Sequence, residues 1–260
     1  MNVLLFNIGG TNTRLCLSEG GAIGEMHKVL TPKGPEDAIR LMREFVGDRG
    51  VDMASGGIAG AVENGIVIGA PNLPAFEMCN FQEMVADAFR VPTVLMNDAD
   101  VEGLGEALLG AGKDHPLVAY LTAGTGVGGT LVVDGALQPS AHGIEPGKQI
   151  IDVATGRTLE DLVGGAALKR ETGLSPKDVP LSVYEERATA FAVGIYNLAR
   201  LWSPNVVVLG GSMVLKQPGF SIGRIRIELT RIAGGRSMPA LVEASLGDTA
   251  GFVGALALVS

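Results

Sequence analysis

Residues 120–135, YLTAGTGVGGTLVVDG, form the glycine-rich stretch that decides the fold. Gly124, Gly126 and Gly129 satisfy the G-x-G-x-x-G pattern of a dinucleotide-binding turn, which requires a strand before it and a helix after it. The residues that follow, TLVVDG, are β-branched and apolar and end in Asp-Gly, which indicates a second strand and its turn. The glycines are therefore expected in a strand–turn–strand hairpin, whose turn amides can bind a nucleotide phosphate without a helix dipole.

A second stretch near the start of the chain follows the same plan. Residues 4–21, LLFNIGGTNTRLCLSEGG, and residues 118–135, VAYLTAGTGVGGTLVVDG, each contain an apolar strand, a Gly/Thr-rich turn, a second strand and a second glycine turn. Taken singly, each is an ordinary hairpin. As a pair with threonines beside the glycines, they predict a duplicated architecture with two phosphate-binding hairpins.

Composition excludes several classes of function. The chain has 260 residues, enough for one large or two modest domains. Its 20 Lys and Arg against 28 Asp and Glu give a net charge of −8, which argues against nucleic-acid or anionic-membrane partners. Cys16 and Cys79 lack the spacing of a disulfide or zinc motif. Without a signal-peptide pattern or an apolar run of ~20 residues, a cytoplasmic protein is expected.

Strand and helix patterns alternate along the chain, which predicts an α/β fold. The residues from Glu185 onward are expected to form a helix, with Ser182 and Glu185 as its capping box. Strands are expected at 2–7, 13–18, 53–58, 66–69, 92–96, 117–122, 130–133 and 205–209. Helices are expected at about 35–47, 77–89, 99–111, 158–171, 183–202, 219–233 and 249–259.

The motifs NIGGTNTR, PNLP, MNDAD, GAGK, TAGTGVGG, HGIEPGK and VVLGGSM occur in the order and spacing of the ROK sugar kinases. The chain resembles this family from residue 3 to about residue 256. The resemblance implies the actin-like ATPase (ribonuclease H-like) fold, whose two domains bind ATP and a hexose. It also predicts a small domain of residues 1–97 plus 249–260 and a large domain of residues 98–248, with a homodimer as one possible assembly.

Asn97 and Asp98 stand where an apolar strand is expected to end and a helix to begin. Active residues are common there in α/β sheets, and helix N-caps are equally common. Phosphorylation of a sugar hydroxyl needs a carboxylate that accepts the hydroxyl proton. By similarity to the family, Asp98 is this catalytic base, and Asn97 binds sugar hydroxyls beside it.

The resemblance extends the sugar site to Glu145, Lys148 and Glu160. Lys148 replaces a family histidine that contacts sugar and zinc together, and a charged lysine cannot ligate zinc. The family's cysteine cluster is also replaced, by the cysteine-free DVATGRTLEDL, so zinc is not expected. Glu160 follows Thr158 in what is also an ordinary acidic first turn of a helix.

The predicted ATP site comprises the two glycine turns and a third, with Mg²⁺ accompanying the nucleotide. Asn7 stands where relatives have an aspartate whose charge helps to hold that magnesium. Losing such an outer-sphere partner typically costs ~10- to 100-fold in affinity or activity, so Asn7→Asp is expected to raise activity. The residues predicted for this site are Asn7, Gly9, Gly10, Thr11, Thr122, Gly124, Thr125, Gly126, Gly210 and Gly211. Gly210 and Gly211 also fit a simple strand-to-helix turn.

The function predicted from the resemblance is ATP-dependent phosphorylation of a hexose, with glucose converted to glucose 6-phosphate. One alternative is a kinase for an N-acetylhexosamine or fructose, because neutral hexoses offer the same hydroxyls. Another is a sugar- or nucleotide-sensing protein without catalysis, which Asn7 and the missing zinc cluster favour and the retained Asp98 opposes.

Overall fold

The computed structural model describes residues Met1–Ser260, and the chain divides into two compact units. Unit 1 comprises Met1–Gly105, Ser140–Gly143 and Asp248–Ser260, and unit 2 comprises Glu106–Pro139 and Ile144–Gly247. The sequence predicts a domain boundary after Asn97, whereas this division falls within the continuous helix α3 (Asp98–Leu108). The first turns of α3 therefore belong to unit 1 and its last turn to unit 2.

Unit 1 is built on a six-stranded sheet in the order β3-β2-β1-β5-β8, with β4 also paired to β2. β1 is antiparallel to β2 and parallel to β5, and β5 is parallel to β8. The strands are β1 (Asn2–Ile8), β2 (Asn12–Glu19), β3 (Ala22–Ile23), β4 (His27–Leu30), β5 (Met53–Ile58) and β8 (Thr93–Asn97), with a separate hairpin of β6 (Ala61–Glu63) and β7 (Ile66–Ile68). The helices are α1 (Pro35–Val46), η1 (Pro74–Phe76), α2 (Phe81–Phe89), the start of α3, η4 (Gly247–Thr249) and α9 (Ala250–Ala257).

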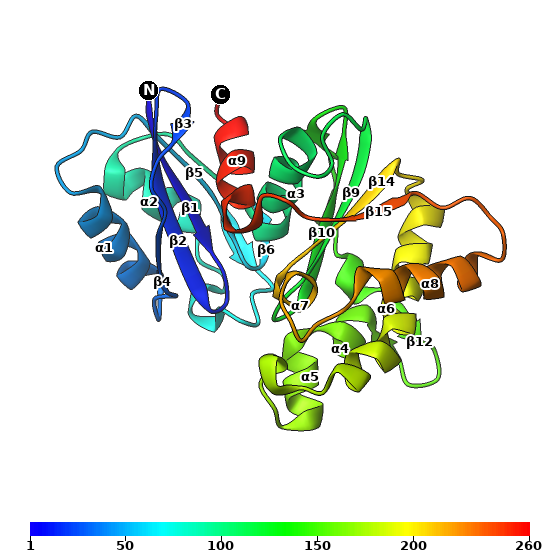
Figure 1. The fold of residues 1–260 in the computed structure, drawn as a ribbon. Helices are drawn as coiled ribbons and strands as arrows, with labels where there is room; N and C mark the ends of the chain where they lie inside the picture. Colours follow the sequence, from blue (N-terminus) through cyan, green and yellow to red (C-terminus); the bar gives the residue numbers. More distant parts are fainter. The chain divides into compact units, whose positions relative to one another are not determined.

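Alternation along β1 places its side chains on two faces of the sheet. Leu4, Phe6 and Ile8 are buried in the cluster that includes α1 and α2. Val3 and Leu5 are buried in the cluster that includes Val101 of α3 and Phe252 of α9. Figure 1 shows α1 and α2 on one side of this sheet and α9 on the other. Because side chains alternate with a period of two, Asn7 belongs to the face of α3 and α9.

Unit 2 repeats the plan with a five-stranded sheet in the order β11-β10-β9-β14-β15. β9 is antiparallel to β10 and parallel to β14, which is parallel to β15. The strands are β9 (Leu117–Ala123), β10 (Val127–Val133), β11 (Ala136–Leu137), β14 (Val206–Gly210) and β15 (Ala240–Glu243), with a small pair of β12 (Ile150–Asp152) and β13 (Arg157–Thr158). The helices are η2 (Pro146–Lys148), α4 (Leu159–Val163), α5 (Gly165–Thr172), η3 (Pro176–Asp178), α6 (Leu181–Leu201), α7 (Ser212–Leu215) and α8 (Ile222–Ala233).

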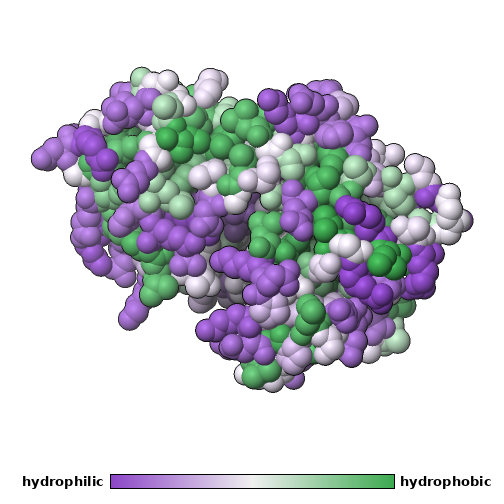
Figure 2. All heavy atoms as spheres, in the orientation of Figure 1, coloured by the Kyte–Doolittle hydropathy of each residue, from purple (hydrophilic) through white to green (hydrophobic).

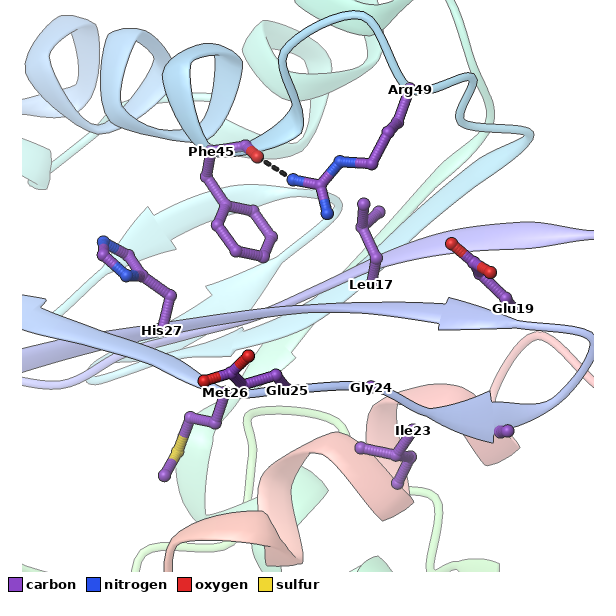
Figure 3. A pocket seen from close by; sticks show the side chains of 10 residues that line it. Leu17, Glu19, Ile23, Gly24, Glu25, Met26, His27, Phe45 and Arg49 are labelled. Carbon is purple, nitrogen blue, oxygen red and sulfur yellow. Dashed lines mark hydrogen bonds between the residues drawn. The ribbon is translucent and has the colours of Figure 1, made fainter.

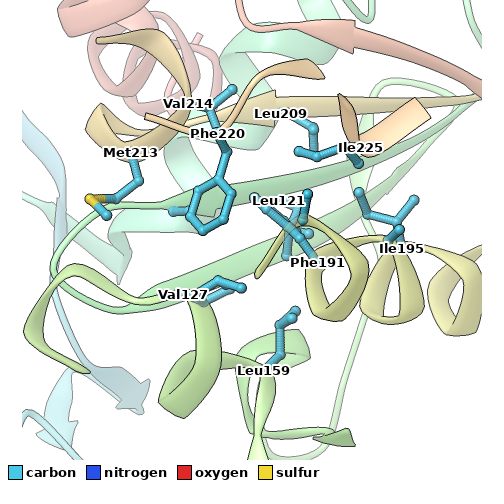
Figure 4. Close-up of a cluster of buried hydrophobic side chains, with 14 of the residues drawn as sticks. Leu121, Val127, Leu159, Phe191, Ile195, Leu209, Met213, Val214, Phe220 and Ile225 are labelled. Carbon is cyan, nitrogen blue, oxygen red and sulfur yellow. The ribbon is translucent and has the colours of Figure 1, made fainter. Parts of the chain in front are cut away.

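The core of unit 2 lies between its sheet and the helices α4, α6 and α8. Leu121 of β9, Phe191 of α6 and Ile225 of α8 are fully buried in one cluster, and Figure 4 shows their side chains converging. The ring of Phe220 meets Phe191 edge-on, with centroids 5.2 Å apart, an arrangement that aromatic quadrupoles favour. Leu159 and Val163 of α4 belong to the same cluster, so this packing also fixes the helix that carries Glu160.

Both glycine stretches form the hairpins that the sequence predicts. Gly9–Thr11 connect β1 to β2, and Gly124–Gly126 connect β9 to β10, with Gly129 inside β10. No helix follows Gly129 within the hairpin, so the exclusion of a dinucleotide-binding turn is confirmed. In each sheet the hairpin's first strand also pairs in parallel with a later strand, which confirms the duplicated plan.

Three helix predictions need correction. The predicted capping box of Ser182 and Glu185 is wrong, because α6 begins at Leu181 after Pro180, whose extended backbone precedes the first turn. The helix expected at 158–171 is two helices, because Gly164 is extended (φ −70°, ψ 145°) between α4 and α5. The helix expected from 77 begins at Phe81, after Asn80 caps it by accepting from the Glu83 amide.

The face drawn in Figure 2 is largely hydrophilic, with smaller hydrophobic areas between. Large apolar residues that are exposed belong to separate elements, among them Leu201 of α6 and Ile227 of α8. Single exposed apolar residues are ordinary on protein surfaces and identify no interface. None of the helices is both long and apolar enough to span a bilayer.

Candidate active site

Asn97 and Asp98 stand at the carboxyl end of β8, where the sequence predicts them. The pairing of Ile8 with Ile58 and of Ile58 with Asn97 aligns this end with that of β1. Asn97 Oδ1 accepts from the Ala99 amide at 2.8 Å, and Asn97 Nδ2 donates to the Gly60 carbonyl at 2.9 Å. Asn97 therefore caps α3 and ties it to a neighbouring loop. Its amide still has one N–H and further lone pairs for a ligand.

Asp98 is the first residue of α3 and is half-buried. Its Oδ1 accepts from the Ala99 amide at 2.9 Å. This bond fixes one oxygen against the helix start, where the aligned peptide dipoles favour a negative charge. A carboxylate has a second oxygen and further lone pairs, so the same side chain can also accept from a hydroxyl.

The turn of the unit 1 hairpin exposes Gly10 and Thr11. The Gly9 amide donates to the Asn12 carbonyl at 3.0 Å, and the Gly9 carbonyl accepts from Thr31 Oγ1 at 2.6 Å. A Cβ on Gly10 would lie 2.9 Å from Asn72 Cβ, within the PNLP motif. The turn is thus held at both ends and leaves its tip accessible, as a phosphate site requires.

In the unit 2 hairpin, helix α5 fixes the turn by its first amides. The Gly165 amide donates to the Gly124 carbonyl and the Ala166 amide to the Thr125 carbonyl, each at 2.8 Å. A Cβ on Gly126 would lie 2.4 Å from Glu160 Oε2, whereas one on Gly124 would meet nothing within 4 Å. Packing therefore accounts for Gly126, and Gly124 lies in open space where a ligand could approach.

Glu160 and Lys148 form one ion pair next to this turn. Lys148 Nζ lies 2.6 Å from Glu160 Oε1, and Glu160 Oε2 accepts from the Val127 amide at 2.9 Å. Burial alone would lower the pKa of Lys148, but the hydrogen bond to Glu160 and the charges of Glu160, Glu145 and Asp161 together raise it. Lys148 therefore stays charged through neutral pH and can donate hydrogen bonds to sugar hydroxyls.

Glu145 is exposed and precedes the short helix η2, which ends in Lys148. η2 lies against β10. A Cβ on Gly147 would come 2.0 Å from the Val127 carbonyl oxygen, and one on Gly129 would come 2.8 Å from Pro146 Cγ. Unit 2 thus brings Lys148 and Glu160 into contact and places Glu145 on the same constrained loop.

Gly210 and Gly211 lie tightly against β9. A Cβ on Gly210 would be 2.3 Å from the Tyr120 hydroxyl, and one on Gly211 (φ +86°) would be 2.2 Å from the Ala123 carbonyl oxygen. Thr122 pairs with Gly128 on one side and with Gly210 on the other. The strand-to-helix turn into α7 therefore accounts for both glycines by packing. Their contact with a nucleotide stays a prediction.

Thr158 caps α4 and forms a capping box with Asp161. This box was not predicted from the sequence. The Asp161 amide donates to Thr158 Oγ1 at 3.2 Å, and the Thr158 amide donates to Asp161 Oδ2 at 3.1 Å. The bonds from the Thr158 amide and hydroxyl hold the pKa of Asp161 below its usual value despite some burial. Glu160 is presented from this capped first turn.

Replacing Thr158 by alanine is expected to lower the free energy of unfolding by about 1 kcal/mol, because the Asp161 amide loses its acceptor. Urea denaturation followed by circular dichroism would measure the change. Thr158→Ser keeps the hydroxyl and is the matched control. Equal midpoints for the alanine and serine variants would contradict the role assigned to the cap.

The residues around Asn7 suit a magnesium ion bound mainly through its nucleotide. No group of three or more His, Cys, Asp or Glu side chains in the structure could hold a metal by itself. Magnesium does not need one, because it keeps several waters and takes one or two carboxylates together with substrate phosphates. Asn7 Oδ1 is a buried oxygen without a hydrogen-bond donor, and the carboxylate of Glu102 lies beside the same amide. Oxygen donors of this kind fit the ion.

Sequence reasoning missed two glutamates of α3. Glu102 contacts Asn7, and Glu106 is completely buried. A signal was available for Glu106 only, which is the single glutamate within the otherwise apolar stretch GLGEALLGAG, residues 103–112. A buried carboxylate needs several hydrogen-bond donors, and glycines leave room for them.

A pocket of about 600 Å³ lies in unit 1 between β2, β4 and the end of α1. Figure 3 shows Phe45 between His27 and Arg49 on its wall. The imidazole stacks on the ring at 5.6 Å, and the guanidinium lies 5.0 Å from its centroid. Glu19 on the pocket wall pairs with Asn2, at the opposite end of the hairpin from Gly9–Thr11. This pocket is therefore separate from the predicted phosphate turn.

Comparisons with known proteins give the family and the fold of the chain. A glucokinase from Aeropyrum pernix is 25% identical to this chain over 307 residues, covering 98% of the chain and 96% of the relative. The solved structure of a ROK family glucokinase from Streptomyces griseus, in complex with glucose and AMPPNP, is 25% identical with a TM-score of 0.81, covering 99% of each chain. The ROK hexokinase from Thermus thermophilus is 25% identical with a TM-score of 0.80, covering 98% of this chain and 97% of its own.

These structures have the actin-like ATPase fold, so the predicted α/β fold class is confirmed. The ROK family model matches residues 4–260, nearly the whole chain. The predicted resemblance is therefore confirmed over the length that carries both hairpins and the strand ends. This chain belongs to the ROK family.

Proposed function

We propose that this chain is an ATP-dependent sugar kinase that phosphorylates a hexose hydroxyl, with glucose to glucose 6-phosphate as its reaction. The observation that carries the proposal is the half-buried carboxylate of Asp98 at the carboxyl end of β8, within a member of the ROK family. The similarity to a glucokinase with bound glucose and AMPPNP supports the choice of substrates.

In the proposed mechanism, Asp98 accepts the proton of the attacking hydroxyl as the phosphoryl group leaves ATP. Asn97, Glu145, Lys148 and Glu160 bind and orient the sugar. Magnesium, when bound, neutralises charge that develops on the phosphates. Excluding water from the reacting groups prevents hydrolysis of ATP.

The proposed nucleotide site uses the backbone of the two hairpin turns. The accessible tip of Gly10 and Thr11 and the open face of Gly124 support this assignment. Thr122, Thr125 and Gly126 complete the second turn, and Gly210 and Gly211 are assigned to the adenosine.

The experiment is a coupled assay of ADP release with purified protein, ATP and Mg²⁺, run against a panel of sugars. Turnover with glucose that exceeds the sugar-free rate is the expected result. Turnover only with fructose or an N-acetylhexosamine would keep the kinase chemistry and replace the substrate. ATP hydrolysis that no sugar stimulates would contradict the proposal.

A sensing protein without catalysis is the second candidate, because Asn7 lacks the charge of an aspartate. It predicts that sugar or nucleotide binds, measured by isothermal titration calorimetry, while no sugar is phosphorylated. Phosphorylation of any hexose in the panel would exclude it.

A further inference from the structure

The side chain of Asn7 is joined to α3 by a contact between residues 95 positions apart. Asn7 Nδ2 donates to Glu102 Oε1 at 3.3 Å. Asn7 is only 3% exposed, and Glu102 lies in the second turn of α3 and is half-buried. An aspartate at residue 7 could not make this bond, because an ionised carboxylate has no donor.

The neighbours of Asn7 hold its amide in place. Asn7 is paired with Arg14 on one side and with Gly57 on the other, in the middle of the sheet. A Cβ on Gly251, in α9, would lie 2.8 Å from Asn7 Nδ2. The amide nitrogen is therefore enclosed between α9 and the Glu102 carboxylate and points at that carboxylate.

The other end of the amide has no protein partner. Asn7 Oδ1 is one of three buried side-chain polar atoms without a hydrogen bond, the others being Arg14 Nε and Ser18 Oγ. A buried acceptor without a donor costs free energy, so natural proteins rarely keep one unless a water, an ion or a function accounts for it. The amide thus combines a fixed donor toward Glu102 with an oxygen that nothing in the protein satisfies.

We propose that Glu102 supplies the negative charge toward the nucleotide's divalent cation that Asn7 lacks, and that Asn7 positions the Glu102 carboxylate. The proposed charge lies on α3 and not on β1, at the same face of the unit 1 sheet. Magnesium accepts such a carboxylate directly or through its waters. This inference rests on the proposed function. Glu102 would allow the kinase to bind its metal without an aspartate at residue 7.

A purely structural role predicts something different. If the pair only ties β1 to α3, Glu102→Gln changes little, because the glutamine oxygen still accepts from Asn7 Nδ2. If the charge matters, the same variant loses affinity for the metal. Adding Asn7→Asp to the Glu102→Gln variant then restores the affinity for the metal, because the pair again consists of one carboxylate and one amide.

The test measures Mn²⁺ binding in the presence of AMPPNP, by electron paramagnetic resonance of the free ion, with thermal melting as the check on folding. Glu102→Gln is expected to weaken Mn²⁺ binding about tenfold. The double variant Asn7→Asp/Glu102→Gln is expected to return it close to the wild-type value. Glu44→Gln removes an exposed charge from α1 of the same unit and is the matched control, expected to bind as the wild type does.

Each outcome separates this inference from the function on which it rests. Wild-type protein that binds no Mn²⁺ with AMPPNP contradicts the proposed function itself. Wild-type binding with an unaffected Glu102→Gln variant overturns the role of Glu102 alone. A double variant that binds Mn²⁺ as weakly as Glu102→Gln does would show that a carboxylate at residue 7 cannot replace the one at residue 102, and would overturn that part of the inference.

Discussion

Replacing Asp98 by asparagine is expected to lower kcat for sugar phosphorylation by about 10²- to 10⁴-fold, the usual contribution of a general base. The variant keeps the shape of the side chain and an oxygen that can accept from the Ala99 amide, as Asp98 Oδ1 does. The KM for the sugar is expected to change far less, because only proton transfer loses its acceptor. A coupled assay over a range of sugar concentrations would give both constants.

The matched control is Asp87→Asn, which makes the same chemical change at an exposed position of α2 in the same unit. It is expected to leave kcat and KM unchanged. Thermal melting of all three proteins would verify that neither substitution unfolds the chain. If the Asp98→Asn enzyme has the wild-type kcat, Asp98 is not the catalytic base, although the protein would still be a sugar kinase.

The hairpins could be predicted from sequence because their signals are local. An apolar run, a glycine turn and a second β-branched run lie within eighteen residues, and nothing distant is needed to specify them. The position of Asn97 and Asp98 was equally accessible, since the strand pattern VPTVLM ends directly before them. The class of fold followed from the alternation of such elements.

Helix starts were less predictable, because several residues compete to cap them. Ser182 and Glu185 have the spacing of a capping box, yet α6 already begins at Leu181, directly after Pro180. Thr158 has an aspartate three residues later instead of a glutamate, and it forms the box that the structure contains. Pro180 and Leu181 lie outside the four residues of the Ser182–Glu185 pattern, so the pattern does not contain the residue at which α6 starts.

The contacts of Asn7 and Glu106 could not be predicted from one sequence. Asn7 and Glu102 are 95 positions apart, and Glu106 and Leu246 are 140 positions apart. Neither pair has a local spacing that marks it. The sequence alone suggested that Asn7→Asp would raise activity, whereas the Glu102 carboxylate beside it makes the outcome depend on both positions.

Replacing Glu106 by alanine is expected to lower the free energy of unfolding by on the order of 3–5 kcal/mol, because three backbone amides lose an acceptor at about 1–3 kcal/mol each. The Glu106 side chain is fully buried and accepts from three backbone amides. Ala111 and Ser245 donate to Oε2 at 2.8 and 3.1 Å, and Leu246 donates to Oε1 at 2.8 Å. Alanine removes this acceptor from all three amides and leaves a cavity.

Gly110 makes this arrangement possible, because a Cβ there would lie 2.0 Å from Glu106 Oε2. Glu106→Gln keeps the volume of the side chain but turns an amide nitrogen toward backbone donors, so a smaller loss of about 1–3 kcal/mol is expected. Urea denaturation would rank the variants, and hydrogen exchange of the Ala111 and Leu246 amides would locate the effect. Faster exchange at both amides is expected before global unfolding.

Glu185→Ala, on the exposed face of α6 in the same unit, is the matched control and is expected to change stability little. The comparison tests one physical point: the Glu106 carboxylate stabilises the fold because three backbone amides donate to it. If Glu106→Ala and Glu185→Ala unfold at the same urea concentration, water must satisfy the three amides as well as the carboxylate does. The segment joining β15 to η4 would then not depend on α3 for its stability.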